Sequence, residues 1–204
     1  MLVHLVDLDS EAHDNAPFTP EALAIMEYTD ELLGNILNDL PANYAVVVVS
    51  DHGFEKIDRV VNLNVIAAQR SVRGIRSQGG IAVAEDGDAG KFLLELKSDP
   101  QYGIGRQIPK EELQRFAPTL SSAAAVFEPV AGFWFGTTDS TELFSKPAEA
   151  GQHGHWPSRY RAVYLARGSG IRPTRLPEIS MTEIVQRLAS LLGVSFTALP
   201  AQGR

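Results

Sequence analysis

The chain has 204 residues, no cysteine and a formal net charge of −7, and 44% of its residues are hydrophobic. This composition provides enough apolar side chains for one substantial core, while the absence of cysteine excludes disulfides and thiolate metal ligands. The negative charge argues against non-specific binding to nucleic acid or anionic membranes, and no apolar run reaches the roughly 18 residues of a membrane span.

The first 53 residues predict a β-α-β unit. Leu2–Leu8 is mostly apolar and predicts a buried strand. Pro20 opens a helix in which apolar residues recur at helical spacing until Pro41, and Ala45–Val49 predicts a second buried strand. Strands connected through such a helix run parallel. The polar residues that follow the two strands are therefore expected at one edge of the sheet.

The middle of the chain predicts a small α+β lobe inserted into the core. The elements expected in it are a short helix from Pro109 to Phe116 and strands at Ala123–Val126 and Phe133–Phe135, divided by Glu128-Pro129. Phe133, Trp134 and Phe135 are expected to pack in the lobe's own core, with stacking on a nucleobase as the alternative.

After residue 150 the chain returns to the core. Ala162–Ala166 predicts another buried strand, and the last helix is expected to begin near Met181 behind Ser180 as its N-cap and to end at Gly193. The predicted organisation is an α/β core of residues 1–58 and 151–204 with an inserted lobe of residues 59–150.

Three separated segments carry histidine or aspartate at metal-ligand spacing. They are Asp9-Ser-Glu-Ala-His13, Ser50-Asp51-His52-Gly53 and Gly151-Gln-His153-Gly154. Each alone is common in turns and caps. Together, in a glycine-flanked loop and beyond predicted strands, they indicate a metal-dependent hydrolase. Mixed imidazole and carboxylate ligands suit zinc, and the ligand types leave manganese or iron open.

These segments, in this order, resemble the alkaline phosphatase superfamily and, within it, the type I phosphodiesterase/nucleotide pyrophosphatase family. The resemblance implies an α/β fold with a three-layer α/β/α core, here incomplete, whose sheet is largely parallel. It also implies two zinc ions, one held by Asp9, His13 and His153 and the other held in part by Asp51 and His52. With only two protein ligands, the second ion is expected to bind weakly.

The family places a Thr or Ser nucleophile in an N-terminal half that has no counterpart here. Ser10, Thr19, Thr29 and Ser50 lack the family's surrounding pattern, so we assign no catalytic nucleophile. We therefore expect the C-terminal part of a phosphodiesterase or nucleotide pyrophosphatase, a truncated enzyme with little activity alone. The alternatives are a phosphomonoesterase, sulfatase-like or phosphomutase relative, and a non-catalytic metal-binding remnant.

The expected partner is a small phosphate-ester substrate, with no nucleic-acid or membrane partner. His155 and Arg159 are candidates for supporting the metal ligands or contacting substrate, with an ordinary surface-loop histidine as the alternative for His155. An incomplete sheet exposes an unpaired edge, which predicts self-association. No signal-peptide pattern follows Met1, and the compartment is left open.

Overall fold

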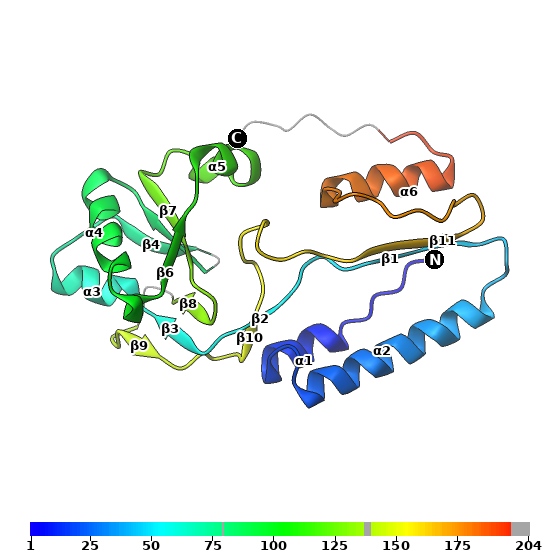
Figure 1. The fold of residues 1–204 in the computed structure, drawn as a ribbon, viewed down its shortest axis with the longest axis horizontal. Coiled ribbons are helices and arrows are strands. Elements are labelled where there is room, and N and C mark those ends of the chain that lie inside the picture. The colour runs from blue at the N-terminus through cyan, green and yellow to red at the C-terminus, as the bar shows by residue number, and fades with distance from the viewer. Residues whose placement is uncertain (79, 137–139, 197–204) are drawn as a thin grey trace. The chain divides into compact units, whose positions relative to one another are not determined.

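The computed structural model describes residues 1–78, 80–136 and 140–196 and divides the chain into two compact units. The first unit comprises Met1–Leu33 and His52–Arg161, and the second comprises Gly34–Asp51 and Ala162–Arg204. Figure 1 labels the helices and strands of both. Within the described residues, every helix is too short or too polar to cross a bilayer. The predicted division into a core of residues 1–58 and 151–204 and an inserted lobe of residues 59–150 stays a prediction.

A four-stranded antiparallel sheet of order β4-β5-β7-β6 forms the centre of the first unit. Its strands are β4 (Ile75–Gln78), β5 (Ile81–Ala84), β7 (Ala125–Pro129) and β6 (Ile104–Gln107). Every residue of β5 is buried, because successive side chains point to opposite faces and both faces of the sheet are covered.

Helices cover the two faces of this sheet (Figure 1). They are α3 (Leu63–Gln69), α4 (Gly87–Lys97) and α5 (Lys110–Phe116). Short 3-10 helices at Pro100–Tyr102 and Pro118–Leu120 connect α4 to β6 and α5 to β7. Ala82 and Ala84 pack with α3 and α4 on one face, while Ile81 and Val83 pack with α5 on the other. Helix α4 begins behind Asp86, whose carboxylate accepts hydrogen bonds from two backbone N–H groups of the first turn.

A three-stranded sheet of order β8-β3-β9 completes the lobe. Strand β3 (Arg59–Val61) runs parallel to β8 (Phe133–Phe135) and antiparallel to β9 (Phe144–Ser145). Phe135 is 1% exposed and belongs to the apolar cluster of α3 and α4, against which Phe133 also packs. The prediction that these aromatic residues fill the lobe's core is therefore confirmed for Phe133 and Phe135.

Two further predictions for this region have different outcomes. The short helix expected from Pro109 to Phe116 is confirmed as α5. The strand expected at Ala123–Val126 begins later, and the predicted break at Glu128-Pro129 is wrong because both residues lie inside β7. The proline is tolerated because it is the last residue of the strand.

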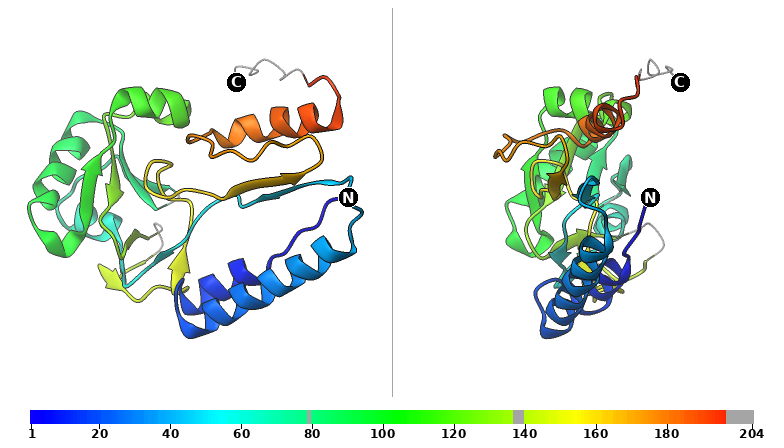
Figure 2. Two further views of the ribbon diagram at one scale, coloured as in Figure 1. Left: turned by 45° about the vertical axis from the view of Figure 1, so that its right-hand side comes forward. Right: turned by 90° about the vertical axis from the view of Figure 1, so that its right-hand side faces the viewer.

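The second unit contains a two-stranded antiparallel ribbon and a helix. Strand β1 (Ala45–Val49) pairs with β11 (Tyr164–Gly168), and α6 (Ile184–Leu192) follows a 3-10 turn at Met181–Glu183. Figure 2 shows α6 running beside the ribbon, and the guanidinium of Arg187 lies 6.0 Å from the Tyr164 ring. The predicted N-cap at Ser180 is confirmed as a capping box, and α6 ends at Gly193 with a positive φ.

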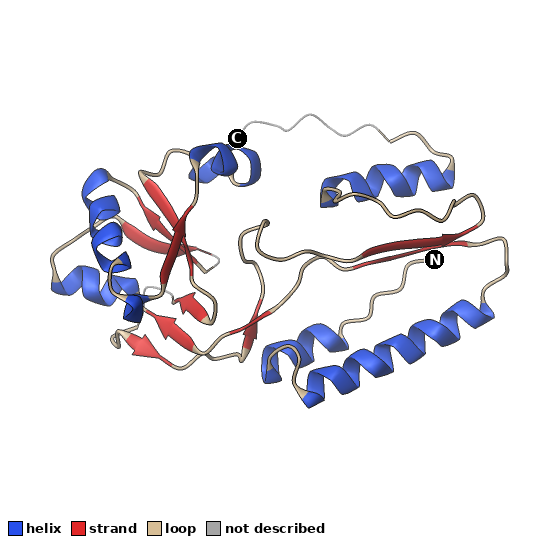
Figure 3. Ribbon diagram, in the orientation of Figure 1, coloured by secondary structure: helices blue, strands red, loops and turns tan. Residues whose placement is uncertain are grey.

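The start of the chain differs from the prediction. Residues 1–6 form no strand and their side chains are exposed, and α1 (Asp7–Asn15) follows them directly (Figure 3). Two acidic residues in the first turn, Asp7 and Asp9, stabilise a helix N-terminus at this point. Helix α2 (Pro20–Asp39) is confirmed. Its apolar stripe is only half buried, with Ala22 its one fully buried residue among those described.

The parallel β-α-β unit is consequently wrong, since β1 pairs with β11 and antiparallel. The mixed α/β character of the fold is confirmed. The largely parallel sheet is not confirmed, because the ladder between β3 and β8 is the only parallel pairing within the described residues.

Candidate metal centre

Two elements of the first unit carry the predicted ligands Asp9, His13 and His153. Asp9 and His13 are one turn apart on α1, which places both side chains on the same face of the helix. His153 follows β10 (Gly151–Gln152), which pairs with β2 (Glu55–Lys56). One ligand atom from each of the three residues lies within 4.8 Å of the others. A cluster of this width is within reach of one divalent ion after small side-chain rotations.

Helix α1 and β10 approach closely because residue 151 is glycine. A Cβ atom at this position would lie 2.1 Å from the carbonyl oxygen of Ala12. Ala12 is buried, with 3% of the residue exposed. The short distance between the two backbones lets His13 reach across, with its Nδ1 3.0 Å from the Gly151 carbonyl oxygen. Gly151 thus decides how closely the two parts of the site can approach.

The surroundings of His13 fix the orientation of its ring. A carbonyl oxygen can only accept, so Nδ1 is the protonated nitrogen and donates to Gly151. The carboxylate of Glu149 lies 3.1 Å from the same Nδ1 and also accepts from the side chain of Gln152. The other ring nitrogen, Nε2, lies 3.9 Å from Asp9 Oδ2. Histidine ligands of metals are typically oriented by a partner on the second nitrogen in this way.

His52 joins the same cluster. Its ring stacks on that of His153, with the centroids 3.7 Å apart and the planes at 12°. Its Nε2 lies 3.7 Å from Asp9 Oδ1. Phe54 makes edge contacts with the rings of His13, His52 and His153, at centroid distances of 4.9, 5.5 and 5.2 Å. Phe54 therefore forms an apolar wall beside the three imidazoles, a role that the sequence reasoning missed.

The structure brings four of the five predicted ligands together. These are Asp9, His13, His52 and His153, all in the first unit. Asp51 is exposed and is the last residue of its segment in the second unit. Its predicted role as a ligand stays a prediction.

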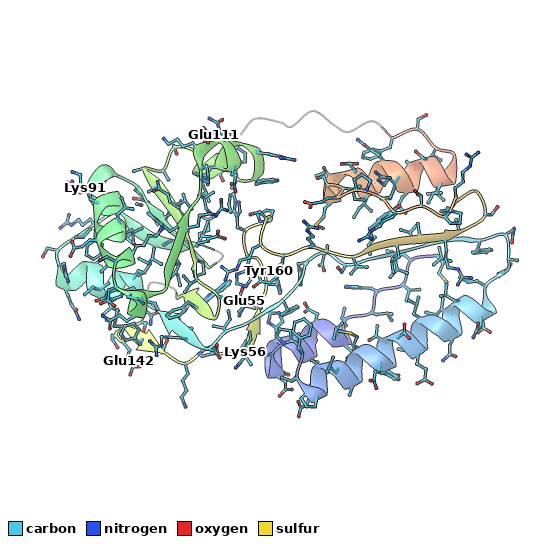
Figure 4. The ribbon with its side chains drawn as sticks, in the orientation of Figure 1. Glu55, Lys56, Lys91, Glu111, Glu142 and Tyr160 are labelled. Atoms are coloured by element: carbon cyan, nitrogen blue, oxygen red, sulfur yellow. The ribbon has the colours of Figure 1, made fainter. Side chains whose placement is uncertain are left out.

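His155 and Arg159 belong to a buried polar network around Glu55. The His155 side chain is only 3% exposed, so the alternative of a surface-loop histidine is wrong. Burial lowers the pKa of His155 below its ordinary value. Arg159 pairs with Glu55 at 2.9 Å, and the Tyr160 hydroxyl donates to the same carboxylate. Figure 4 shows the Glu55 and Tyr160 side chains together; the predicted contact of Arg159 with substrate stays a prediction.

Comparisons with known proteins agree with the family resemblance. The sequence model of the family "Type I phosphodiesterase / nucleotide pyrophosphatase" matches residues 1–154. No curated protein matches the chain significantly.

Solved structures share the fold at low sequence identity. Murine ectonucleotide pyrophosphatase/phosphodiesterase 5 is 21% identical with a TM-score of 0.61, over 97% of this chain and 54% of its own. The human protein of the same name is 19% identical with a TM-score of 0.62, and the match covers 97% of this chain and 54% of that protein. Phosphonoacetate hydrolase from Sinorhizobium meliloti 1021, solved with phosphonoformate, is 19% identical with a TM-score of 0.55. This match covers 81% of this chain and 45% of that protein. The chain thus spans about half the length of the proteins that it resembles.

Proposed function

Because the chain belongs to the type I phosphodiesterase/nucleotide pyrophosphatase family, we propose that it provides metal ligands for the hydrolysis of phosphoester or phosphoanhydride bonds. Asp9, His13 and His153 hold one divalent ion. The observation that carries this proposal is the gathering of their ligand atoms within 4.8 Å. Helix α1 and β10 bring these residues together although His13 and its partner Gly151 are 138 positions apart.

The chemistry of the donors fits zinc. Two imidazoles and a carboxylate are borderline ligands that suit this ion, and ligand type also admits manganese or iron. When bound, the ion supplies Lewis-acid polarisation of a phosphoryl oxygen. The chain's own residues orient and shield the site: Gly151 and Glu149 fix the His13 ring, and Phe54 excludes water from one side.

The second ion of the family is proposed at the position of His52, with Asp51 as its predicted second ligand. The proximity of His52 Nε2 to Asp9 Oδ1, at 3.7 Å, supports a position adjacent to the first ion. Two protein ligands are fewer than a catalytic zinc usually has. We therefore expect the second ion to bind more weakly than the first.

A zinc titration of the purified chain tests the metal centre. We expect His13→Ala to weaken zinc binding by on the order of 100-fold, about 2.7 kcal/mol. The matched control is His4→Ala, which removes an exposed histidine from the coil of residues 1–6. Equal affinities for the two variants, or no binding by the wild type, would contradict the proposal.

We further propose that the chain alone has little hydrolytic activity, because none of its Ser and Thr residues is assigned as nucleophile. The assay is turnover of an aryl phosphodiester with zinc present, with an aryl phosphomonoester in parallel. Rates of roughly 1–1000 s⁻¹, typical of enzymes, would refute this expectation. A preference for the monoester would favour the phosphomonoesterase alternative.

Self-association is also proposed. Within the described residues the ribbon has only two strands, so each of its strands has one side outside the ladder. Such edges pair readily with another chain. Size-exclusion chromatography is expected to give a dimer or larger species, and a clean monomer would contradict the proposal.

A further inference from the structure

The Glu55 carboxylate is buried in the first unit and has partners on both oxygens. Its side chain is 7% exposed. Oε1 accepts from the Gly132 backbone N–H at 2.6 Å and from Arg159 Nη2 at 2.9 Å. Oε2 accepts from the Tyr160 hydroxyl. A buried carboxylate with this many donors is strongly held, because each bond is charge-assisted.

Two of these three partners of Glu55, Arg159 and Tyr160, come from the segment that carries His153. Glu55 lies three residues after His52, and in the ladder it is directly opposite Gln152, the residue before His153. Arg159 and Tyr160 lie a few residues beyond the same histidine. Glu55 therefore contacts both sides of the loop that carries His153: its backbone lies in the ladder opposite Gln152, before the histidine, and its carboxylate binds Arg159 and Tyr160, after it.

The backbone around His153 needs such a restraint. The β2–β10 ladder is only two residues long on each side, which is too short to fix a loop by itself. Gly154 follows with a φ of +83°, and nothing lies within 4 Å of the position of a Cβ there. Beyond the glycine, the loop is held by the buried Trp156, which donates to Glu112, and by the contacts of Glu55. We expect loss of the Glu55 contacts to loosen the loop at Gly154 and to weaken the 3.7 Å stack of His52 on His153.

We propose that Glu55 is a positioning residue of the metal centre: its carboxylate, bound to Arg159 and Tyr160, holds the His153 loop against the strand that follows His52. The effect of Glu55 on metal binding rests on the proposed function. Its geometric part, the restraint on His153, can be tested without a metal. Glu55 is not one of the proposed metal ligands and acts through the two imidazoles.

The test compares Glu55→Gln, which keeps the side-chain shape but removes the charge and one acceptor, with Glu111→Gln. Glu111 is an exposed glutamate on α5 (Figure 4) and serves as the matched control. Zinc affinity is measured by competition with a chromophoric chelator. We expect Glu55→Gln to weaken zinc binding by roughly 10- to 100-fold, as for residues that support metal ligands elsewhere, while Glu111→Gln leaves it unchanged.

A metal-free readout separates this proposal from the proposed function. In the stacked arrangement each imidazole shifts the ring-proton resonances of the other, so NMR of the zinc-free protein reports the stack directly. We expect Glu55→Gln to move the His52 and His153 resonances toward their free values while the remaining spectrum stays that of a folded chain. Wild-type protein that binds no zinc would refute the metal centre, and the NMR comparison would still decide whether Glu55 positions His153.

The outcome that overturns the proposal is a folded Glu55→Gln variant with wild-type imidazole resonances and wild-type zinc affinity. Should this variant not fold, Tyr160→Phe decides the question, because it removes one donor and keeps the pair between Glu55 and Arg159. A smaller shift of the His153 resonances in the same direction supports the proposal. Wild-type values in Tyr160→Phe overturn it.

Discussion

Replacing Gly151 by alanine tests how α1 and β10 are held together. The added Cβ would lie 2.1 Å from the Ala12 carbonyl oxygen, whereas Cβ contacts below 3.0 Å essentially never occur. The Ala12 oxygen is a backbone atom, and the position of a Cβ is fixed by its own backbone, so neither atom can rotate away as the end of a flexible side chain would. The two elements must therefore separate by about 1 Å or more.

This displacement acts directly on His13. Its Nδ1 is 3.0 Å from the Gly151 oxygen, and a further 1 Å takes the pair beyond hydrogen-bond range. The lost bond is worth about 0.5–1.5 kcal/mol of stability. The ring also loses one of the two groups that fix its orientation, and loss of such a partner elsewhere lowers metal affinity roughly 10- to 100-fold. We expect both effects in Gly151→Ala.

The assay combines urea unfolding of the metal-free protein with chelator competition for zinc. Gly34→Ala is the matched control, because nothing lies within 4 Å of a Cβ at that helical position. It should retain zinc affinity and raise the free energy of unfolding by roughly 0.5–1 kcal/mol. If Gly151→Ala bound zinc like the wild type, the close approach of the two backbones would not be what positions His13.

Further predictions concern the core, the last helix, the pH dependence and the metal. Phe127→Ala removes a fully buried ring from the sheet of the first unit and should lower the free energy of unfolding in urea by about 3–5 kcal/mol. Ser180→Ala should reduce stability by about 1 kcal/mol and lower the helical circular dichroism signal, because the 3-10 turn that leads into α6 loses its capping box. Hydrogen bonds from Arg106 hold the pKa of Glu112 below its ordinary value of 4.5, so the unfolded chain binds more protons as the pH falls. This stabilisation is present above the unfolded pKa and is lost at lower pH, and Glu112→Gln should flatten the acid side of the stability curve. Removing zinc held at 100 times its Kd with excess chelator should lower stability by about 2.7 kcal/mol, and an unchanged melting temperature would contradict specific binding to the folded state.

The sequence predicts elements that carry their own start and stop signals. Helix α2 has a proline at its first position and apolar residues at helical spacing, and Ser180 and Gly193 mark the ends of the last helix. Such signals are local, so they survive in any tertiary context. The strand expected at Leu2–Leu8 had no such support, because a strand depends on a partner that its own residues do not specify.

The same distinction holds for the candidate site. The predicted ligands were recognisable because three segments with histidine or aspartate at metal-ligand spacing occur in one chain, although each alone is common in turns and caps. Glu55, Phe54 and Glu149 were missed because their roles arise from neighbours distant in sequence. A weak signal existed: Phe54 and Glu55 directly follow the Ser50-Asp51-His52-Gly53 segment.

The connectivity of the first unit has a consequence for the order in which the chain folds. All strands of its four-stranded sheet come from residues 75–129, so their contacts are comparatively local and are expected to form early. Once that sheet and β3 have formed, the backbone N–H of Asp58 can donate to the carbonyl oxygen of Gly132. This bond shortens the loop that must close before the N–H of Ile57 can donate to the carbonyl oxygen of Ala150. The entropic cost of closing a loop is smaller when the effective length of the loop is shorter. We therefore expect the imidazole cluster to assemble after the lobe, on a sheet that has already formed.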